Sequence, residues 1–463
     1  MKRVVLGLDI GTTHLKAGVY DLAGLLIARQ AQKIEMLTPS QGMYEQDPEL
    51  VYAILWGLLT RLRSEYEVLA IGFSVAMHSF IALDAKNTPL TKSWTWMDQR
   101  SDSVMDSLSS QVRKQQKDAT GTPIHSMSPW LKWLWLKQAA NTSVDRPVGL
   151  KEYLLYRLTG QWVTDYSTAA ATGFLNQATL QWDEAALRIA ELDTDHLPVL
   201  QEMRDAIPWQ GIPLVLGGSD GAMAHVGLGI TAGQGVLSLG TSGALRITAD
   251  TLPKQVPNSL FAYSMGTDQG YLVGAALSNV GNLLQWLAKV WGMDVIDLLN
   301  ESLQNPILAD LPLFLPYLFG SRFPYWRLHL PTGYMNLQAT HTDHSLKQAV
   351  IVAIVATIRQ ALDVLESSVG KIQIIFGGSG LLGNAYLSQE IVNALQKPIA
   401  FIPNEDASVY GAARLAAAAI GYVWPTLRHV SLIEPKVDRG FYYKDKVEAM
   451  EHYVSLLATD DVL

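Results

Sequence analysis

The stretch Leu6-Gly7-Leu8-Asp9-Ile10-Gly11-Thr12-Thr13-His14-Leu15-Lys16 has a clipped copy at mid-chain, Val236-Leu237-Ser238-Leu239-Gly240-Thr241-Ser242-Gly243. In each run an apolar strand leads into a Gly-Thr turn and then into a second strand, so each predicts a β-hairpin. Such a turn offers backbone N–H groups and small hydroxyls, the donors that a phosphate chain needs. Two similar turns in two halves of the chain predict a duplicated fold that closes on a nucleotide from both sides.

The two runs differ in one side chain that bears on metal binding. Only the first carries an acid, Asp9, and the copy has Ser238 at the aligned position. A carboxylate beside phosphates is repelled unless a cation lies between them, so Asp9 predicts a Mg²⁺ site. The alternative is two ordinary hairpins that share their turn chemistry by chance.

Composition narrows the class of protein. The chain has 463 residues, of which 49% are hydrophobic and 17% charged, and its net charge is −8. This composition predicts a large buried core in two or more domains and argues against a nucleic-acid partner. The chain has no cysteine, which excludes disulfides, thiolate zinc sites and a cysteine nucleophile. The apolar runs Val4–Leu8 and Ala349–Ile358 are too short for a signal peptide and a membrane span, so we expect a soluble cytoplasmic protein without a membrane partner.

The two halves of the chain show the same alternation of strand-like and helix-like segments. We expect strands at 4–9, 15–20, 25–31, 70–75 and 214–216, then at 235–239, 244–248, 271–274, 372–376 and 399–402. We expect helices at 48–62, 101–116, 129–139, 151–158 and 183–191, then at 278–290, 294–299, 344–370, 384–395 and 407–420. This order predicts an α/β fold with mixed sheets flanked by helices. The glycine-rich stretch 227–233 places the boundary between two domains, 1–230 and 231–463.

A carboxylate follows a buried strand in Leu214-Val215-Leu216-Gly217-Gly218-Ser219-Asp220-Gly221. The carboxyl end of a sheet strand is where a site is expected. Asp220 there can act as a general base that takes a proton from a substrate hydroxyl as its oxygen attacks a γ-phosphate. The alternative is a helix cap, because serine and aspartate both cap well.

A second glycine-rich run, Gly377-Gly378-Ser379-Gly380-Leu381-Leu382-Gly383, contains G-x-G-x-x-G directly after a strand, and Glu405 lies roughly where a ribose-binding acid would fall. This pattern favours an NAD-dependent oxidoreductase, although it leaves the two Gly-Thr hairpins unexplained. A glycine turn on which adenosine lies close to the backbone fits the same residues. No G-x-x-x-x-G-K-[S/T] motif occurs, which excludes a P-loop kinase.

Candidate contacts for a polyhydroxylated ligand follow the strand that ends at Val75. They are His78 in Ala76-Met77-His78-Ser79, and Trp96 and Asp98 in Trp94-Thr95-Trp96-Met97-Asp98-Gln99-Arg100. An aromatic face beside hydrogen-bonding groups suits a sugar. A lone histidine or tryptophan is more often structural, but their placement on loops at one sheet edge favours a site.

These residues together resemble the FGGY carbohydrate kinases, within the actin-like and sugar-kinase ATPase superfamily, and the resemblance runs nearly end to end. It implies two ribonuclease-H-like domains with a cleft between them, ATP and Mg²⁺ as cofactors, and Asp220 as catalytic base. The implied phosphate and nucleotide contacts are Gly11, Thr12, Thr13, Lys16, Gly240, Thr241, Ser242, Gly281, Gln285, Gly377 and Gly378, with Asp9 at the metal. The run from Met127 to Leu136 is similar to a specific fingerprint of the family.

Three stretches look like the gluconate kinase branch: Ala76 to Ser79, Gly121 to Pro129, and Lys151-Glu152-Tyr153. The resemblance implies ATP-dependent phosphorylation of D-gluconate to 6-phosphogluconate. Because gluconate is an anion, its pocket should contain cations or donors, and His125 and Lys151 are candidates.

The chain departs from the family pattern in its second half. The family reads Gly-Glu-Arg-x-Pro where this chain has Gly320-Ser321-Arg322-Phe323-Pro324, and Thr332 and Val352 lie in two further altered stretches. These departures bear on turnover more than on sugar class, and they motivate one alternative, a degenerate kinase that acts as a sugar-binding protein. A kinase for another sugar such as D-xylulose is a further alternative. The sequence does not determine the oligomeric state, although an exposed apolar surface would allow a homodimer.

Overall fold

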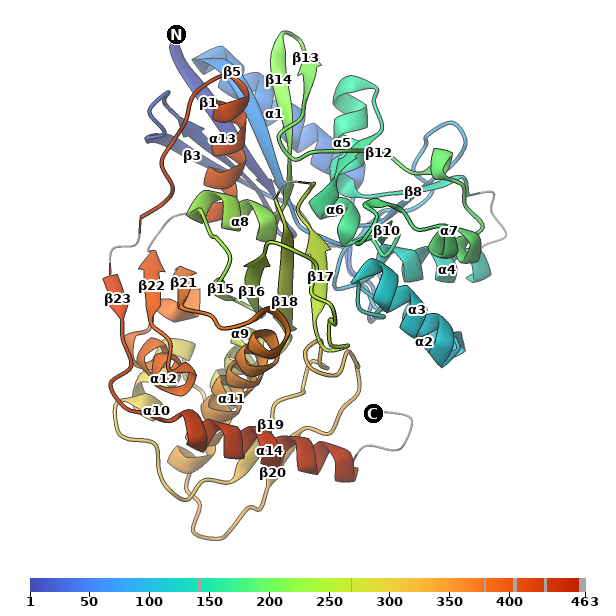
Figure 1. Ribbon diagram of the computed structural model, residues 1–463. Helices are drawn as coiled ribbons and strands as arrows, with labels where there is room; N and C mark the ends of the chain where they lie inside the picture. Colours follow the sequence, from blue (N-terminus) through green and yellow to red (C-terminus); the bar gives the residue numbers. More distant parts are fainter. Residues whose placement is uncertain (140–143, 268, 379, 403–405, 429–430, 458–463) are drawn as a thin grey trace.

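Two mixed sheets, one in each half of the chain, organise the molecule (Figure 1). The computed structural model describes residues 1–139, 144–267, 269–378, 380–402, 406–428 and 431–457. The fold is the two-domain α/β architecture predicted from the sequence. The first sheet ends with Ser219 and the second begins with Gln234, on either side of the expected boundary at 230.

The first sheet has the order β13-β14-β5-β1-β2-β3. Its strands are β1 (Lys2–Ile10), β2 (His14–Tyr20), β3 (Leu26–Lys33), β5 (Tyr66–Val75), β13 (Ala206–Trp209) and β14 (Ile212–Ser219). β1 pairs antiparallel with β2 and parallel with β5, which in turn pairs parallel with β14. Val4, Leu6 and Leu8 are fully buried, as expected for a central strand covered on both faces.

Helices α1 (Pro48–Glu65) and α5 (Leu150–Thr159) pack on one face of this sheet. The other face is covered by α13 (Ala407–Ala419), which comes from the far end of the chain and lies beside β1 and β5 in Figure 1. The first domain is therefore completed by a helix from the second half of the sequence.

A row of glycines lets α13 approach this face closely. Gly18, Gly7 and Gly72 lie in register across β2, β1 and β5. A Cβ at Gly7 or Gly72 would overlap backbone carbonyls of α13, and one at Gly411 of α13 would overlap the Met223 carbonyl of α8 (Asp220–Leu228). Any side chain at these places would push the helix off the sheet.

The second sheet repeats the plan of the first, with the order β17-β18-β16-β15-β21-β22-β23. Its strands are β15 (Gln234–Leu239), β16 (Gly243–Ala249), β17 (Phe261–Ser264), β18 (Tyr271–Leu277), β21 (Ile374–Gly378), β22 (Ile399–Ile402) and β23 (Ser431–Ile433). β15 pairs antiparallel with β16 and parallel with β21, which matches the pairing of β1 with β2 and β5. The predicted duplication is thus present in the strand order.

The helices of the second domain are α9 (Gly281–Val290), α10 (Val295–Leu303), α11 (Asp343–Val369), α12 (Ala385–Leu395) and α14 (Gly440–Leu457). In the part of the chain that the structure describes, one helix, α11, is long and apolar enough by length and composition to cross a membrane. In its most apolar window 83% is buried inside the fold, and its residues belong to the main core of this domain.

A lobe of short elements flanks the first sheet, and one sequence prediction fails there. The single helix expected at 101–116 is two helices, α2 (Asp102–Ser107) and α3 (Ser110–Thr120), because Ser109 adopts an extended backbone and its hydroxyl caps α3 at the Val112 N–H. The other helices of the lobe are α4 (Pro129–Ala139), α6 (Tyr166–Ala170), α7 (Glu184–Ala190) and the 3₁₀ turn η1 (Thr194–His196).

Short strand pairs complete the fold: β4 (Glu45–Gln46) with β7 (Ser93–Trp94), β6 (Ile81–Leu83) with β8 (Arg146–Val148), β9 (Val163–Asp165) with β12 (Val199–Gln201), β10 (Leu175–Asn176) with β11 (Gln181–Trp182), and β19 (Leu313–Leu315) with β20 (Gly333–Met335).

Candidate active site

A cavity of about 560 Å³ lies between the two domains. It is lined by the end of β1, by the turns that follow β1 and β15, and by the first residues of α8 and α13. Of the residues predicted from the sequence, Asp9, Gly11, Thr12, Lys16, His78, Trp96, Asp220, Gly240, Ser242, Gly377 and Gly378 line it. The two Gly-Thr turns therefore lie on one cavity, as the duplicated sequence predicted.

The first turn carries a buried acid and a paired lysine. Asp9 lies opposite Lys16 in the β1–β2 register, and the Ser74 hydroxyl donates to Asp9 Oδ1 at 2.7 Å. Lys16 Nζ donates to Oδ2 of Asp406 at 2.7 Å, which links β2 to the start of α13. Burial and then the charges of Asp406 and Asp220 raise the pKa of Asp9 to about 7. Carboxylates that repel one another in this way would be stabilised by a cation.

The second turn is held by backbone hydrogen bonds. The Gly240 N–H donates to the Ser242 carbonyl at 2.9 Å, and the N–H groups of Gly281 and Asn282 donate to the carbonyls of Gly240 at 3.1 Å and Thr241 at 2.8 Å. A Cβ at Gly281 would overlap the Gly240 carbonyl. Gly281 therefore docks α9 on the turn and does not itself line the cavity.

Asp220 is the first residue of α8, directly after β14. The helix is capped by Ser219, whose Oγ accepts the Ala222 N–H, so the capping alternative for Asp220 is not needed. Gly217 has a φ of +57°, and a Cβ there would overlap the Phe73 carbonyl of β5. Only glycine allows this irregularity in β14, and it leads the chain to the point where the Asp220 carboxylate lines the cavity.

The glycine run after β21 supplies Gly377 and Gly378 to the cavity wall. Residues Gly380–Gly383 form a short 3₁₀ helix, η2, and α12 begins only at Ala385. A dinucleotide fold would continue from such a run directly into a helix. Ser379 and the candidate ribose acid Glu405 lie outside the described residues.

His78 and Trp96 bring two loops of the first domain to the cavity. His78 has a left-handed φ of +66°, which is strained for a residue with a side chain, and its Nδ1 donates to the Ala171 carbonyl at 2.7 Å. Burial lowers the pKa of His78 to about 3, so the ring is neutral and Nε2 is left as an acceptor. Trp96 Nε1 donates to Thr12 Oγ1 at 3.2 Å, which ties its loop to the first turn.

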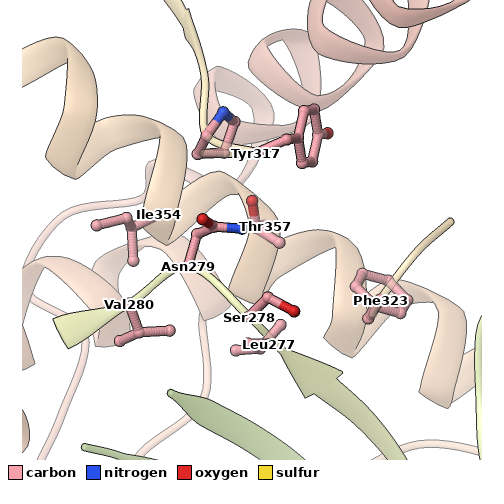
Figure 2. Close-up of a pocket in the computed structure, with 9 residues that line it drawn as sticks. Leu277, Ser278, Asn279, Val280, Tyr317, Phe323, Ile354 and Thr357 are labelled. Carbon is pink, nitrogen blue, oxygen red and sulfur yellow. The ribbon is translucent and has the colours of Figure 1, made fainter. Parts of the chain in front are cut away.

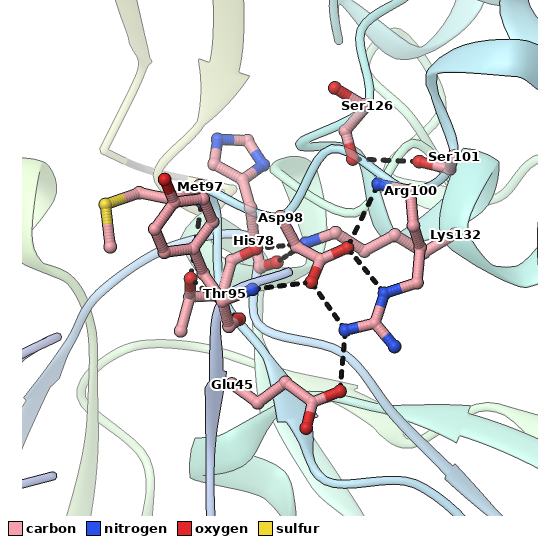
Figure 3. Close-up of polar contacts among 10 residues, drawn as sticks. Glu45, His78, Thr95, Met97, Asp98, Arg100, Ser101, Ser126 and Lys132 are labelled. Carbon is pink, nitrogen blue, oxygen red and sulfur yellow. Dashed lines mark hydrogen bonds and ion pairs between the residues drawn. The ribbon is translucent and has the colours of Figure 1, made fainter. Parts of the chain in front are cut away.

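Lys132 of α4 holds these two loops together. It is fully buried, and its Nζ donates to the carbonyls of His78 at 2.8 Å and Thr95 at 2.7 Å (Figure 3). Burial lowers the pKa of Lys132 to about 7. Because Thr95 precedes Trp96 in the chain, one ammonium group positions both candidate sugar contacts.

Asp98 lies behind the cavity wall and does not line the cavity. It is 1% exposed, it accepts the Tyr44 N–H at 2.9 Å, and it binds Arg100 through Nε at 2.9 Å and Nη2 at 2.7 Å (Figure 3). Arg100 also pairs with Glu45 and lies over the Trp94 ring at 4.0 Å. The structure therefore corrects the expectation of a direct substrate contact: Asp98 fixes the loop that carries Trp96.

Lys151 and His125, the expected contacts for an anionic substrate, are also absent from the cavity wall. Lys151 is fully buried in an ion pair with Asp165 inside the first domain, which corrects its expected role because a buried ammonium needs such a partner. His125 Nδ1 accepts the N–H of Met127, which does line the cavity, and its ring packs against Trp326. His125 thus supports the wall from behind.

Besides Gly281, three of the expected nucleotide contacts lie outside the lining residues. Thr13, Thr241 and Gln285 are exposed, the first two on the turns and the third on α9. Thr12 and Ser242, the immediate neighbours of Thr13 and Thr241, do line the cavity.

Among the cavity residues that sequence reasoning missed are two arginines, a tyrosine and an acid: Arg246, Arg322, Tyr263 and Asp406. Asp406 precedes an alanine-rich helical run, a pattern that indicates a helix N-cap but gives no sign of its bond to Lys16, 390 positions away. Arg246 and Tyr263 lie within apolar strands, and no local pattern marked them.

Comparison with known families decides the class of protein. Residues 4–227 match the N-terminal domain of the FGGY family of carbohydrate kinases, and residues 235–420 match the C-terminal domain of that family. The chain belongs to the FGGY family of carbohydrate kinases. It is therefore a sugar kinase of the class that uses ATP as phosphate donor, and the oxidoreductase alternative drawn from the glycine run is set aside.

The relatives of this FGGY kinase include gluconokinases and xylulose kinases. The gluconokinase of Bacillus subtilis is 29% identical over 456 residues, which cover 91% of this chain and 89% of the relative. The xylulose kinase of Escherichia coli is 26% identical over 434 residues, covering 89% and 90%. Among solved structures, a gluconate kinase and a ligand-bound xylulose kinase, both from Lactobacillus acidophilus, match with TM-scores of 0.93 and 0.92, each at 27% identity over 99% of both chains.

Proposed function

We propose that this FGGY kinase transfers the γ-phosphoryl group of ATP to the terminal hydroxyl of D-gluconate, giving 6-phospho-D-gluconate. The observation that carries the proposal is the position of Asp220, whose carboxylate lines the same cavity as both Gly-Thr turns. A carboxylate in that place can accept the proton of the sugar hydroxyl as its oxygen attacks phosphorus.

ATP would lie mainly on the second domain, with its adenosine against Gly377 and Gly378 and its phosphates between the two turns. Lys16 and Thr12 would contact the phosphates from the first domain. Closure of the domains would exclude water, which otherwise competes with the sugar hydroxyl for the phosphoryl group.

Mg²⁺ would accompany ATP, with Asp9 as the residue that orients it. The donor chemistry fits, because Asp9, Asp220 and Asp406 bring carboxylate oxygens to one cavity beside a phosphate site. Within the described residues no group of three or more His, Cys, Asp or Glu could hold a metal ion alone, so phosphate oxygens would complete the set of ligands. The cation would neutralise negative charge on the phosphoryl group.

Gluconate is favoured over a ketose by two arguments. The gluconokinase relative is more similar in sequence than the xylulose kinase, at 29% against 26% identity. The cavity wall also carries two arginines, Arg246 and Arg322, which suit an anionic sugar. D-xylulose is the second candidate, favoured by the equally high structural similarity to a xylulose kinase.

A coupled assay of ADP release across a panel of aldonates and ketoses tests the proposal. We expect the highest kcat/KM with D-gluconate, and with D-[6-¹³C]gluconate we expect phosphorus coupling at C6 of the product. A higher kcat/KM with D-xylulose would refute gluconate as the substrate and leave the kinase assignment intact. Tight sugar binding without any ADP release would instead identify a degenerate kinase that acts as a sugar-binding protein.

A further inference from the structure

The charged side chains of the cavity are sorted into two ends. At one end Asp406 and Asp220 both raise the pKa of Asp9, so these three carboxylates lie within electrostatic range of one another, with Lys16 among them. At the other end Arg246 and Arg322 both line the cavity, and burial and then the charge of Arg246 lower the pKa of Arg322 to about 10. The acidic end adjoins the first phosphate turn through Asp9 and Lys16, and the basic end adjoins the candidate sugar contact Trp96 through Arg322.

Arg322 is placed at the basic end by a loop that packs on the end of β18. Its Nη2 donates to the Leu277 carbonyl at 2.9 Å and its backbone N–H donates to Ser278 Oγ at 3.0 Å. Asn279 holds the same loop through the Gly320 carbonyl at 2.6 Å. Figure 2 shows Leu277, Ser278 and Asn279 at the end of this strand, where they line a small cavity of about 10 Å³.

The Arg322 guanidinium also reaches the first domain. It lies 4.9 Å from the ring of Trp96, whose Nε1 donates to Thr12. Arg322 therefore stands between the sugar contacts of the first domain and the sheet of the second, enclosed by protein but open to the cavity.

Arg246 approaches the same region from β16. Its Nε is buried and has no hydrogen-bond partner, and it would lie 3.0 Å from a Cβ placed at Gly221, the residue after Asp220. Within the described part of the chain, no carboxylate forms an ion pair with Arg246 or Arg322. Two neighbouring guanidinium groups without an acid are costly unless an anion pairs with them.

We propose that Arg246 and Arg322 bind the carboxylate of an aldonate substrate and so select sugar acids over neutral sugars. The inference rests on the proposed function and deepens it. In this arrangement the carboxylate lies at the basic end and the chain of hydroxyls runs past His78 and Trp96. The hydroxyl at the far end then reaches Asp220 and the phosphate turns.

A second anion in the cavity, the transferred phosphoryl group, is the competing partner for the same two cations. The arrangement favours the carboxylate, because Lys16 and the first Gly-Thr turn are the residues proposed to bind phosphate at the acidic end. A neutral ketose would leave both arginines without a counter-charge, which is a means of rejecting it.

The test compares D-gluconate with D-glucitol, which has the same chain of hydroxyls but a neutral alcohol in place of the carboxylate. Dissociation constants are measured by calorimetry for the wild type, Arg246→Gln, Arg322→Gln and the control Arg188→Gln, an exposed arginine on α7. Loss of a charged hydrogen bond costs about 1.5–3 kcal/mol, or roughly 10- to 100-fold in affinity. We expect both cavity variants to lose that much affinity for D-gluconate and less than about 3-fold for D-glucitol, with the control unchanged.

Arg246→Gln serves as the second variant because Arg322→Gln also removes the contact with Trp96. If both variants keep the wild-type preference for D-gluconate, the inference is wrong while the proposed function stands. If they lower kcat equally with every sugar and leave sugar affinity unchanged, the arginines serve the phosphoryl group instead. If the wild type turns over another aldonate such as D-galactonate but not D-gluconate, and that preference needs the arginines, the proposed substrate is wrong and the inference stands.

Discussion

The β1–β2 hairpin and the β15–β16 hairpin have one backbone plan and different side chains. In both, antiparallel strands meet at a Gly-Thr turn, and the first strand pairs in parallel with a third. In the first hairpin Asp9 lies opposite Lys16, whereas in the second Ser238 lies opposite Ala244. The second hairpin instead carries Arg246, two positions further along β16.

This difference shows how two copies of one backbone plan can suit two different substrates that bind in the same cavity. Both turns line the cavity, and the strands beside them carry Asp9 and Lys16 in the first hairpin and Arg246 in the second. The acid of the first hairpin suits a cation and phosphates, and the arginine of the second suits an anionic sugar. Asp220 lies between them, on the helix that follows β14.

The largest expected effect comes from the residue between the hairpins. Asp220→Asn should lower kcat by about 10²- to 10⁴-fold, because the amide cannot accept the hydroxyl proton, while the dissociation constants of sugar and nucleotide stay near those of the wild type. Steady-state kinetics and calorimetry measure the two quantities. Asp297→Asn, an exposed change on α10, is the control. A kcat close to that of the wild type would show that Asp220 is not the catalytic base.

The difference between the hairpins can be tested directly with a pair of variants. Asp9→Asn should lower kcat/KM for ATP by about 10²-fold or more in the presence of Mg²⁺, because one charge that faces the phosphate site is lost. Ser238→Ala, the matched change in the second hairpin, should cost less than about 3-fold. Equal losses in the two variants would mean that the hairpins share metal handling, and the asymmetry argued above would be wrong.

A smaller effect is expected behind the sugar contacts. Lys132→Met should lower kcat/KM for the sugar by about 10- to 100-fold, the scale of a supporting residue, and leave nucleotide affinity unchanged. The reason is that the carbonyls of His78 and Thr95 lose their common donor. A thermal unfolding midpoint close to that of the wild type, with the sugar effect present, identifies a positioning role. Equal weakening of sugar and nucleotide would indicate a general folding defect.

The smallest effect concerns stability and pH. His225 on α8 contacts Thr248 on β16 through Nδ1 at 2.8 Å, and burial lowers the pKa of His225 to about 3 from an ordinary 6.5. Between these values the unfolded chain binds a proton that the folded chain does not, so stability falls as the pH is lowered from about 6.5 toward 3. In urea titrations at pH 7.5 and pH 5, wild type should lose about 2 kcal/mol more free energy of unfolding than His225→Gln. The same loss in both proteins would contradict a neutral buried His225.

The parts of the fold that local patterns encode were predicted well. Asp47 followed by Pro48 marks the start of α1, and α4 begins at Pro129 and ends at Ala139 as expected. The failure at 101–116 is also local in origin, since Ser109 ends one amphipathic pattern and caps the next helix. The short strand β17 and the helix α14 were not predicted.

In the candidate site, too, the residues marked by a local sequence pattern were predicted and the others were not. The turns at Gly11 and Gly240 were predicted because the conformation of a turn depends on residues that are adjacent in the sequence. Lys151 was misread because its partner Asp165 is known only from packing. Arg246 and Asp406 were missed for the same reason. Their roles depend on neighbours that are distant in the sequence and that only folding brings close.

The glycine strip under α13 has a consequence for synthesis of the chain. A ribosome that has made residues 1–230 has produced every strand of the first sheet but none of the helix that covers its Gly7–Gly72 face. Nearly 190 further residues must be made before α13 is complete and can cover that face. The first sheet therefore reaches its final form only when almost the whole polypeptide has emerged. Cutting the gene at the domain boundary would therefore yield an N-terminal fragment with one uncovered sheet face, and not an independent module.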